Sequence, residues 1–309
     1  MSPSIRFLKN SLTFFAIEFQ YEGLETSPNI FYLGAAPNQQ LIPGVKWSYD
    51  HLGKTFYLVG SDYVFPRSAN SIIKDVIRAL GGTVVGEKYI LLGSKKVQPV
   101  VEDIISKNPN VILNTINGDT NIEFFKELQK RNTGSKKIPV VSFSISEVEL
   151  NEMKDISSFV GSYAAWNYFQ SIQSPENRSF IQRFRNQFGK TSVLGDPLVS
   201  AYSGVYLWKE AVETANSFDT NLVIKSIANK SFNSPGGRVY IDHENHHTWK
   251  PVYIGKVNKN KQFDIVWSSQ KVIRPFPFPR YKSVEGWNQF LSNLYKNWDE
   301  NWANPRKTD

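Results

Sequence analysis

The stretch FYLVGSDYVFPR, from Phe56 to Arg67, is the part of the sequence that decides the fold. Its first four residues are aromatic or aliphatic, which is typical of a short buried strand. The strand ends at Gly60, and Pro66 lies in the first turn of a helix that the apolar spacing of residues 72–80 predicts. Open α/β sheets bind their ligands where a strand leads into a helix, so this polar turn is a candidate binding edge.

The same alternation continues toward the C-terminus. Further strands are predicted at residues 83–90, 111–116, 138–143 and 159–165. Apolar residues at spacings of three and four predict helices between them. Thr120 with Glu123 and Ser146 with Glu149 have the spacing of a helix capping box. Strands that alternate with helices of this length predict a mostly parallel sheet covered on both faces.

The flanking regions follow a different pattern. A short strand and a helix are predicted on the N-terminal side, at 30–33 and 42–49. Two long helices begin at Ser174-Pro175 and Asp196-Pro197, which are cap-then-proline sequences. After a short helix, antiparallel strands are predicted at 238–241, 249–256 and 262–267, followed by an aromatic-rich helix near the C-terminus.

Composition narrows the possible functions. The chain has 309 residues, enough for two domains or one large one, and its 40% hydrophobic content supports a packed core. The absence of cysteine excludes thiol catalysis, disulfides and Cys-ligated metals. The net charge is +8, but Lys and Arg are scattered over turns without a basic helix, so nucleic-acid binding is not predicted. No apolar run approaches the ~20 residues of a membrane span.

Sequence signatures of enzymes and cofactors are also missing. The chain contains no G-x-S-x-G elbow and no glycine-rich nucleotide motif, so we predict no enzyme and no cofactor. The cluster His243-Glu244-Asn245-His246-His247 mimics a metal site. It lies between two predicted antiparallel strands without an evident partner ligand, so we interpret it as a solvated hairpin loop and predict no metal.

A series of motifs in order resembles one protein family. The motifs are YEGLE and SPNIFYLGAAPNQQ (21–40), GSDYVFPR (60–67), INGDTN (116–121), NHHTWKP (245–251) and RPFP (274–277). Together they resemble the type I periplasmic binding proteins, in the branch that binds urea and short-chain amides. The resemblance extends from Tyr21 to about Trp267. It implies an α/β fold with parallel sheets, in which two lobes joined by crossover strands close on a ligand.

The resemblance also implies a division of the chain. Residues 1–49 and 191–261 would form the first lobe, and residues 50–190 and 262–309 the second lobe with an aromatic tail. Family members begin with a signal peptide and further βα units that are not recognisable here. We therefore expect an N-terminally truncated chain with an incomplete first lobe and impaired binding.

A urea or amide ligand is small, neutral and planar, so its site needs donors and acceptors around a flat aromatic slot. By resemblance, Tyr63 and Phe65 form the aromatic wall of the second lobe; the alternative for Phe65 is packing on its own helix. The polar candidates follow the predicted strand ends and are Ser61, Asp62, Asn117, Asp119 and Ser144. The alternative for Asn117 and Asp119 is capping of the next helix.

The resemblance implies a periplasmic, non-enzymatic receptor that delivers urea or a short-chain amide to the permease subunits of an ABC importer. A cytoplasmic amide sensor that acts on a regulatory partner protein is the alternative, because the N-terminal residues do not resemble a signal peptide. An amide hydrolase would need a nucleophile and a base, and no recognisable pair is present.

Overall fold

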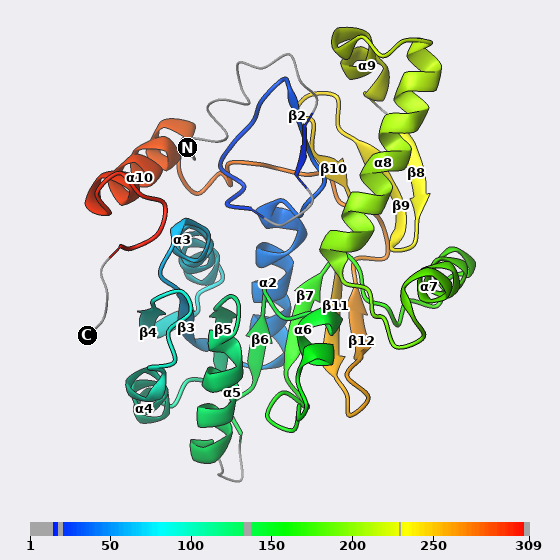
Figure 1. Ribbon diagram of the computed structural model, residues 1–309. Coiled ribbons are helices and arrows are strands. Elements are labelled where there is room, and N and C mark those ends of the chain that lie inside the picture. Colours follow the sequence, from blue (N-terminus) through cyan, green and yellow to red (C-terminus); the bar gives the residue numbers. More distant parts are fainter. Residues whose placement is uncertain (1–14, 18–20, 133–136, 229, 306–309) are drawn as a thin grey trace.

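A seven-stranded sheet organises the larger part of the molecule. The computed structural model describes residues 15–17, 21–132, 137–228 and 230–305. The strand order is β12–β11–β7–β6–β5–β3–β4 (Figure 1). These strands are β3 (Thr55–Ser61), β4 (Thr83–Ile90), β5 (Val111–Thr115), β6 (Val140–Ser142), β7 (Tyr163–Trp166), β11 (Tyr253–Val257) and β12 (Phe263–Ser268). The five strands β3, β4, β5, β6 and β7 run parallel, and β11 pairs antiparallel with β7 and β12, which confirms a mostly parallel sheet.

Helices cover both faces of this sheet, as the uninterrupted apolar run of β3 requires. Phe56 and Leu58 pack against α2 (Leu41–His51), α3 (Val64–Ala79) and α10 (Val284–Asn297). Tyr57 and Val59 point the other way, against α4 (Gln98–Lys107), α5 (Thr120–Arg131) and α6 (Glu147–Glu152). The alternation along one strand therefore builds two cores, one on each side of the sheet.

A smaller body lies beyond the carboxyl ends of these strands. Its strands are β1 (Phe15–Ile17), β2 (Ile30–Tyr32), β8 (Ser231–Ser234), β9 (Gly237–Ile241) and β10 (Thr248–Trp249). A backbone bridge between Tyr32 and His247 connects the β1–β2 pair to the β10–β9–β8 sheet. Helices α8 (Asp196–Ala215) and α9 (Thr220–Ile227) pack on one face through Leu207, Ala211 and Val223. Helix α7 (Pro175–Phe188) packs against the start of α8.

The chain passes between the two bodies along three described segments. They are residues 33–40, which contain the short helix η1 (Pro37–Gln39), residues 167–171 and residues 250–252. Two α/β bodies joined by several crossovers confirm the two-lobed fold that the sequence predicted.

The packing differs from the predicted division into lobes. Helix α2 shares a core with the large sheet, β11 is a strand of that sheet, and α7 packs with α8 rather than on the large sheet. We therefore propose that the first lobe comprises the described residues of 15–36 and 168–250, and the second lobe those of 37–167 and 251–305.

Two local predictions were wrong. The strand predicted at 249–256 is divided into β10 and β11, because Pro251 has no N–H to donate to a ladder. The capping box at Thr120 does not form: Asp119 is the N-cap residue, and the Thr120 hydroxyl donates to Ser94 O at 2.9 Å. The capping box at Ser146 and Glu149 is confirmed.

The close packing of α2 on the sheet gives a test of the fold. A Cβ at Gly44 would lie 2.6 Å from Phe143 Cε1 and 3.2 Å from Ala165 Cβ. In an open helix Gly→Ala stabilises by about 1 kcal/mol, but overpacking a filled core costs about 1–3 kcal/mol. We expect Gly44→Ala to lower the free energy of unfolding, measured by urea denaturation. The matched control is Lys46→Ala, on the exposed face of the same helix; equal or greater stability of Gly44→Ala would contradict the packing.

Candidate functional site: the strand ends and an interlobe cavity

Three of the predicted site residues meet at the carboxyl edge of the large sheet. Asn117 N, after β5, donates to Ser61 Oγ at the end of β3, with a distance of 3.0 Å. Ser144 Oγ, after β6, donates to the carbonyl of Ile116. Parallel strands end at one edge, so the sheet itself brings Ser61, Asn117 and Ser144 into one row. The hydroxyl groups of Ser61 and Ser144 thereby connect neighbouring strand ends.

The Asp62 carboxylate is paired with other groups of the protein. Its carboxylate accepts from Arg67 Nε at 2.7 Å and from Asn304 Nδ2 at 2.7 Å. The Arg67 guanidinium also lies 3.6 Å from the centre of the Tyr89 ring. Asp62 therefore fixes the C-terminal segment to the start of α3, a long-range role that its local sequence does not indicate.

The remaining predicted residues lie in different surroundings. Tyr63 is half-buried, its backbone bridges to Ala303, and burial raises the pKa of its hydroxyl, with a smaller contribution from the charge of Glu22. Phe65 is buried in the core that α2 and α3 share, where its ring has a packing role. Asp119 is exposed at the start of α5.

A cavity of about 380 Å³ lies between the two lobes, where the loop that carries Ser144 continues into α6. Its second-lobe lining is Ser146, Val148 and Glu149, and its first-lobe lining is Gly195, Pro197, Leu198 and Ala201. The volume lies within the range of small-molecule sites. None of the seven predicted site residues is among the lining residues.

The starts of α6 and α8 shape this cavity. Ser146 Oγ accepts from Val148 N at 3.3 Å, and Glu149 Oε2 accepts from Ser146 N at 2.7 Å. A Cβ at Gly195 would lie 3.0 Å from Ser146 Oγ, so the two helix starts are in contact. The Asp196-Pro197 sequence predicts a helix start, but no local pattern indicates that this start faces the other lobe.

A buried carboxyl group supports the same region. Glu147 is fully buried, and its Oε1 accepts from Gln170 N, in the crossover segment 167–171, at 2.6 Å. Within the described residues its Oε2 has no hydrogen-bond partner. Burial raises the pKa of Glu147 to about 8, although the hydrogen bond from Gln170 acts in the opposite direction. The group is therefore mostly protonated at neutral pH.

The histidine cluster lies in the hairpin loop between β9 and β10, as the sequence predicted, and His243 and Glu244 are exposed, but His247 at the end of the loop is not solvated. His247 is fully buried and stacks on Tyr32 with ring centres 4.1 Å apart. Its Nδ1 donates to Asn245 O at 2.7 Å, so Nε2 is free to accept a hydrogen bond from the Tyr21 hydroxyl. Burial lowers the pKa of His247 to about 3, which keeps the ring neutral.

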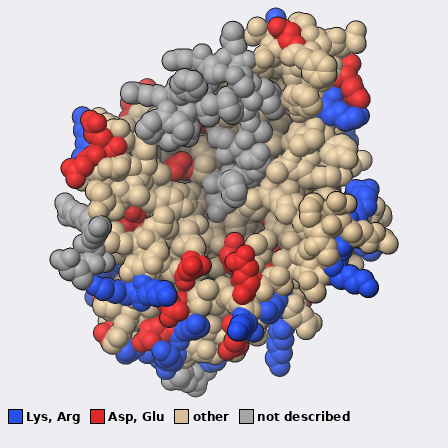
Figure 2. All heavy atoms as spheres, in the orientation of Figure 1, with Lys and Arg blue, Asp and Glu red and all other residues tan. Residues whose placement is uncertain are grey.

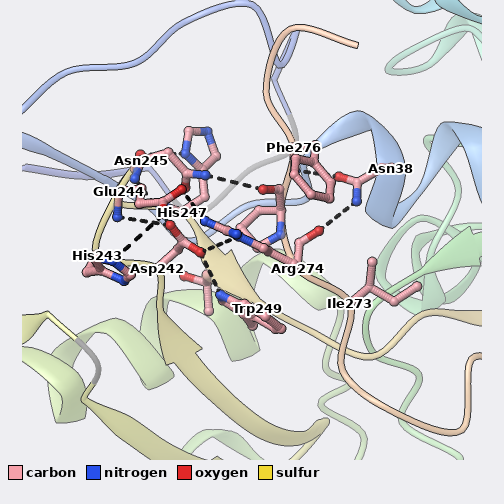
Figure 3. A network of polar contacts seen from close by, with 12 residues as sticks. Asn38, Asp242, His243, Glu244, Asn245, His247, Trp249, Ile273, Arg274 and Phe276 are labelled. Carbon is pink, nitrogen blue, oxygen red and sulfur yellow. Dashed lines mark hydrogen bonds and ion pairs between the residues drawn. The ribbon is translucent and has the colours of Figure 1, made fainter. Parts of the chain in front are cut away.

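Figure 3 shows the polar network around this loop. The buried Asp242 accepts from Trp249 Nε1 at 2.9 Å and from Arg274 Nε at 3.0 Å. Asn38 binds the same extended segment, donating to Arg274 O at 2.7 Å and accepting from Phe276 N at 2.8 Å. Segment 273–276 is thereby tied to the first lobe through Asp242 and to the first crossover through Asn38. Among the described residues, no group of three or more His, Asp or Glu side chains could hold a metal ion.

The surface charges do not form one large patch on the face that Figure 2 shows. Blue Lys and Arg side chains alternate with red Asp and Glu side chains along its lower edge (Figure 2). In the described part of the chain, no helix is both long and apolar enough to cross a membrane.

The pKa of Glu147 predicts a pH-dependent stability. The folded protein retains a proton that the unfolded chain releases above its ordinary pKa of 4.5, so this contribution is full below 4.5 and is lost as the pH rises through about 8. Glu147→Gln should remove this loss. Its free energy of unfolding should rise by about 1–4 kcal/mol relative to the original chain as the pH increases from about 5 to 8.5. Urea unfolding at several pH values measures it. Glu152→Gln, exposed on the same helix, is the control, and parallel pH curves for all three proteins would refute the assignment.

Curated relatives match the chain over part of their length. A protein named limonene hydroxylase from Geobacillus stearothermophilus is 36% identical over 129 residues, 42% of this chain and 24% of that protein. Leu/Ile/Val-binding protein homolog 6 from Brucella melitensis is 24% identical over 239 residues, 75% of this chain. The chain spans only 60% of the length of that second relative.

Solved structures share the fold. An ABC-transporter solute-binding protein from R. palustris, in complex with 4-hydroxybenzoate, has a TM-score of 0.79 at 21% identity and is covered to 76%, with 89% of this chain aligned. A leucine-binding protein from Thermotoga maritima has a TM-score of 0.72 at 17% identity, with 85% of this chain and 75% of that chain aligned. The family described as periplasmic binding protein domain, a family of binding proteins and not of enzymes, matches residues 7–284. The chain belongs to this periplasmic binding protein family.

Proposed function

We propose that this chain is the solute-binding component of an ABC importer and acts in the periplasm. The observation that carries the proposal is the cavity of about 380 Å³ whose lining comes from both lobes. A ligand held there contacts α6 on one side and α8 on the other. Such a ligand favours the closed arrangement of the lobes, because it makes both sets of contacts only when they approach. The names of the Brucella and R. palustris relatives support the same role.

The charges around the cleft favour an uncharged ligand. The Glu149 carboxylate lines the cavity, where it would repel an anionic ligand. Arg67, the cation beside the predicted aromatic wall, is already paired with Asp62 at 2.6 Å. An acid would have to displace Asp62 to use this guanidinium. We therefore propose urea or a short-chain amide, the ligand class of the resembled branch, rather than the benzoates or amino acids named for other relatives.

The hydroxyl and amide groups at the sheet edge suit such a ligand. Urea and amides need both donors and acceptors, and Ser144, Ser146 and Asn117 supply both kinds. These residues follow neighbouring strands, so the row leads from the sheet edge to the cavity. We propose that Tyr63 forms an aromatic boundary of the same cleft. Permease subunits of the importer would then recognise the closed form.

Calorimetric titration with a panel of solutes tests the ligand class. We expect urea or acetamide to bind with a measurable enthalpy, and 4-hydroxybenzoate and leucine to bind at least about tenfold more weakly, a difference of about 1.4 kcal/mol. Methylurea distinguishes a narrow site from a wide one. Preferred binding of 4-hydroxybenzoate or leucine would overturn the proposed ligand class while leaving solute binding intact. No binding of any solute would overturn the function itself.

A variant that fills the cavity tests its location. Ala201 lines the cavity on α8, and Phe at this position adds a ring to the space between the lobes. We expect Ala201→Phe to weaken binding of the preferred solute by at least about tenfold, since the ring competes for the ligand's volume. Val205→Phe is the matched control, because Val205 lies one turn further along α8 and is 63% exposed. Equal affinities of the two variants would place the ligand elsewhere.

A further inference from the structure

One amide side chain joins all three crossover segments. Asn167, in the second crossover, donates from Nδ2 to Gln39 O at 2.9 Å and to Pro251 O at 2.8 Å. These carbonyls belong to the first and third crossovers. Both hydrogens of the amide are therefore used, and this fixes which end of the side chain is oxygen. Oδ1 is buried, and within the described residues it has no hydrogen-bond partner.

A small cavity of about 20 Å³ lies beside Asn167. Its polar lining includes Asn167, Asp196, Ser200, Ser203, Thr248 and Lys250. A water molecule needs a cavity of about 10–15 Å³ or more and two to four polar partners. This cavity satisfies both requirements for a single water and is too small for an organic solute.

Lys250 supplies hydrogen-bond donors to this small cavity. The residue is only 4% exposed, and Nζ donates to Ser200 Oγ at 2.7 Å. An ammonium group carries three hydrogens, so one bond to Ser200 leaves donor capacity. The Asp196 carboxylate lies nearby and accepts from Asn167 N at 3.0 Å. Burial lowers the pKa of Lys250, and the charge of Asp196 opposes that change.

We propose that this cavity is a built hydration site, in which one ordered water accepts from Lys250 Nζ and donates to Asn167 Oδ1. The charges in the lining fit a neutral occupant. The ammonium of Lys250 disfavours a cation, and the Asp196 carboxylate with Asn167 Oδ1 disfavours an anion. The water completes the bonding of the residue that connects the crossovers, so it belongs to the hinge and not to the solute site.

A crystal structure of the full chain at a resolution that shows ordered waters tests the proposal. We expect one density peak within hydrogen-bond distance of both Lys250 Nζ and Asn167 Oδ1. A parallel soak in bromide should give no anomalous peak there. An empty cavity, or a bromide peak inside it, would overturn the hydration site.

A pair of variants identifies the water's donor. Lys250→Met keeps most of the length of the side chain but removes the ammonium group and its three hydrogens, and we expect the peak to disappear from its crystal structure. Ser203→Ala changes another lining residue without touching either proposed partner, and its peak should remain. Retention of the water in Lys250→Met, or its loss in Ser203→Ala, would contradict the assigned partners. If Lys250→Met fails to fold, the crystal structure of the original chain still tests the hydration site.

Discussion

Three chain segments must pass side by side between two separately packed lobes, and the rest of the structure depends on this crossing. Each segment leaves one core and enters another, so its backbone groups lack a continuous sheet ladder at that point. Asn167, Gln39 and Gln40 supply the missing partners: Gln39 Nε2 donates to Thr248 O at 2.9 Å and Gln40 Nε2 to Ala165 O at 2.9 Å. Buried amide side chains can satisfy such groups because each offers two donors and an acceptor.

The crossing also sets the position of the cavity that we propose as the solute site. Glu147 holds the crossover segment through Gln170, and the adjoining Ser146 and Glu149 line the cavity. On the other side, Asp196 accepts from Asn167 N, and the next residues of α8, Pro197 and Leu198, complete the lining. Each wall is thus bonded to the same crossover. A change in the angle between the lobes must change the width of the cavity, which is the geometric requirement for closure on a ligand.

Much of the architecture could be predicted from the sequence because its signals are local. The apolar run of β3 fixed a strand buried on both faces, and the cap-then-proline sequences located α7 and α8. Ser61, Asn117 and Ser144 were also predictable together, since parallel strands end at one edge. The failures concern contacts between distant segments. Nothing near Asp62 indicates Asn304, and nothing near His247 indicates Tyr32.

The C-terminal segment has contacts with both lobes. Arg274 binds Asp242 in the first lobe, while Asn304 binds Asp62 beside the second-lobe sheet edge. Between them, Phe278 N donates to Gly23 O at 2.7 Å and Trp287 is fully buried against the second-lobe core. Residues 274–304 therefore act as a tether that connects the two lobes. The length of this segment therefore limits how far the two lobes can separate, which in the proposed function would also limit how wide the entrance for a solute becomes.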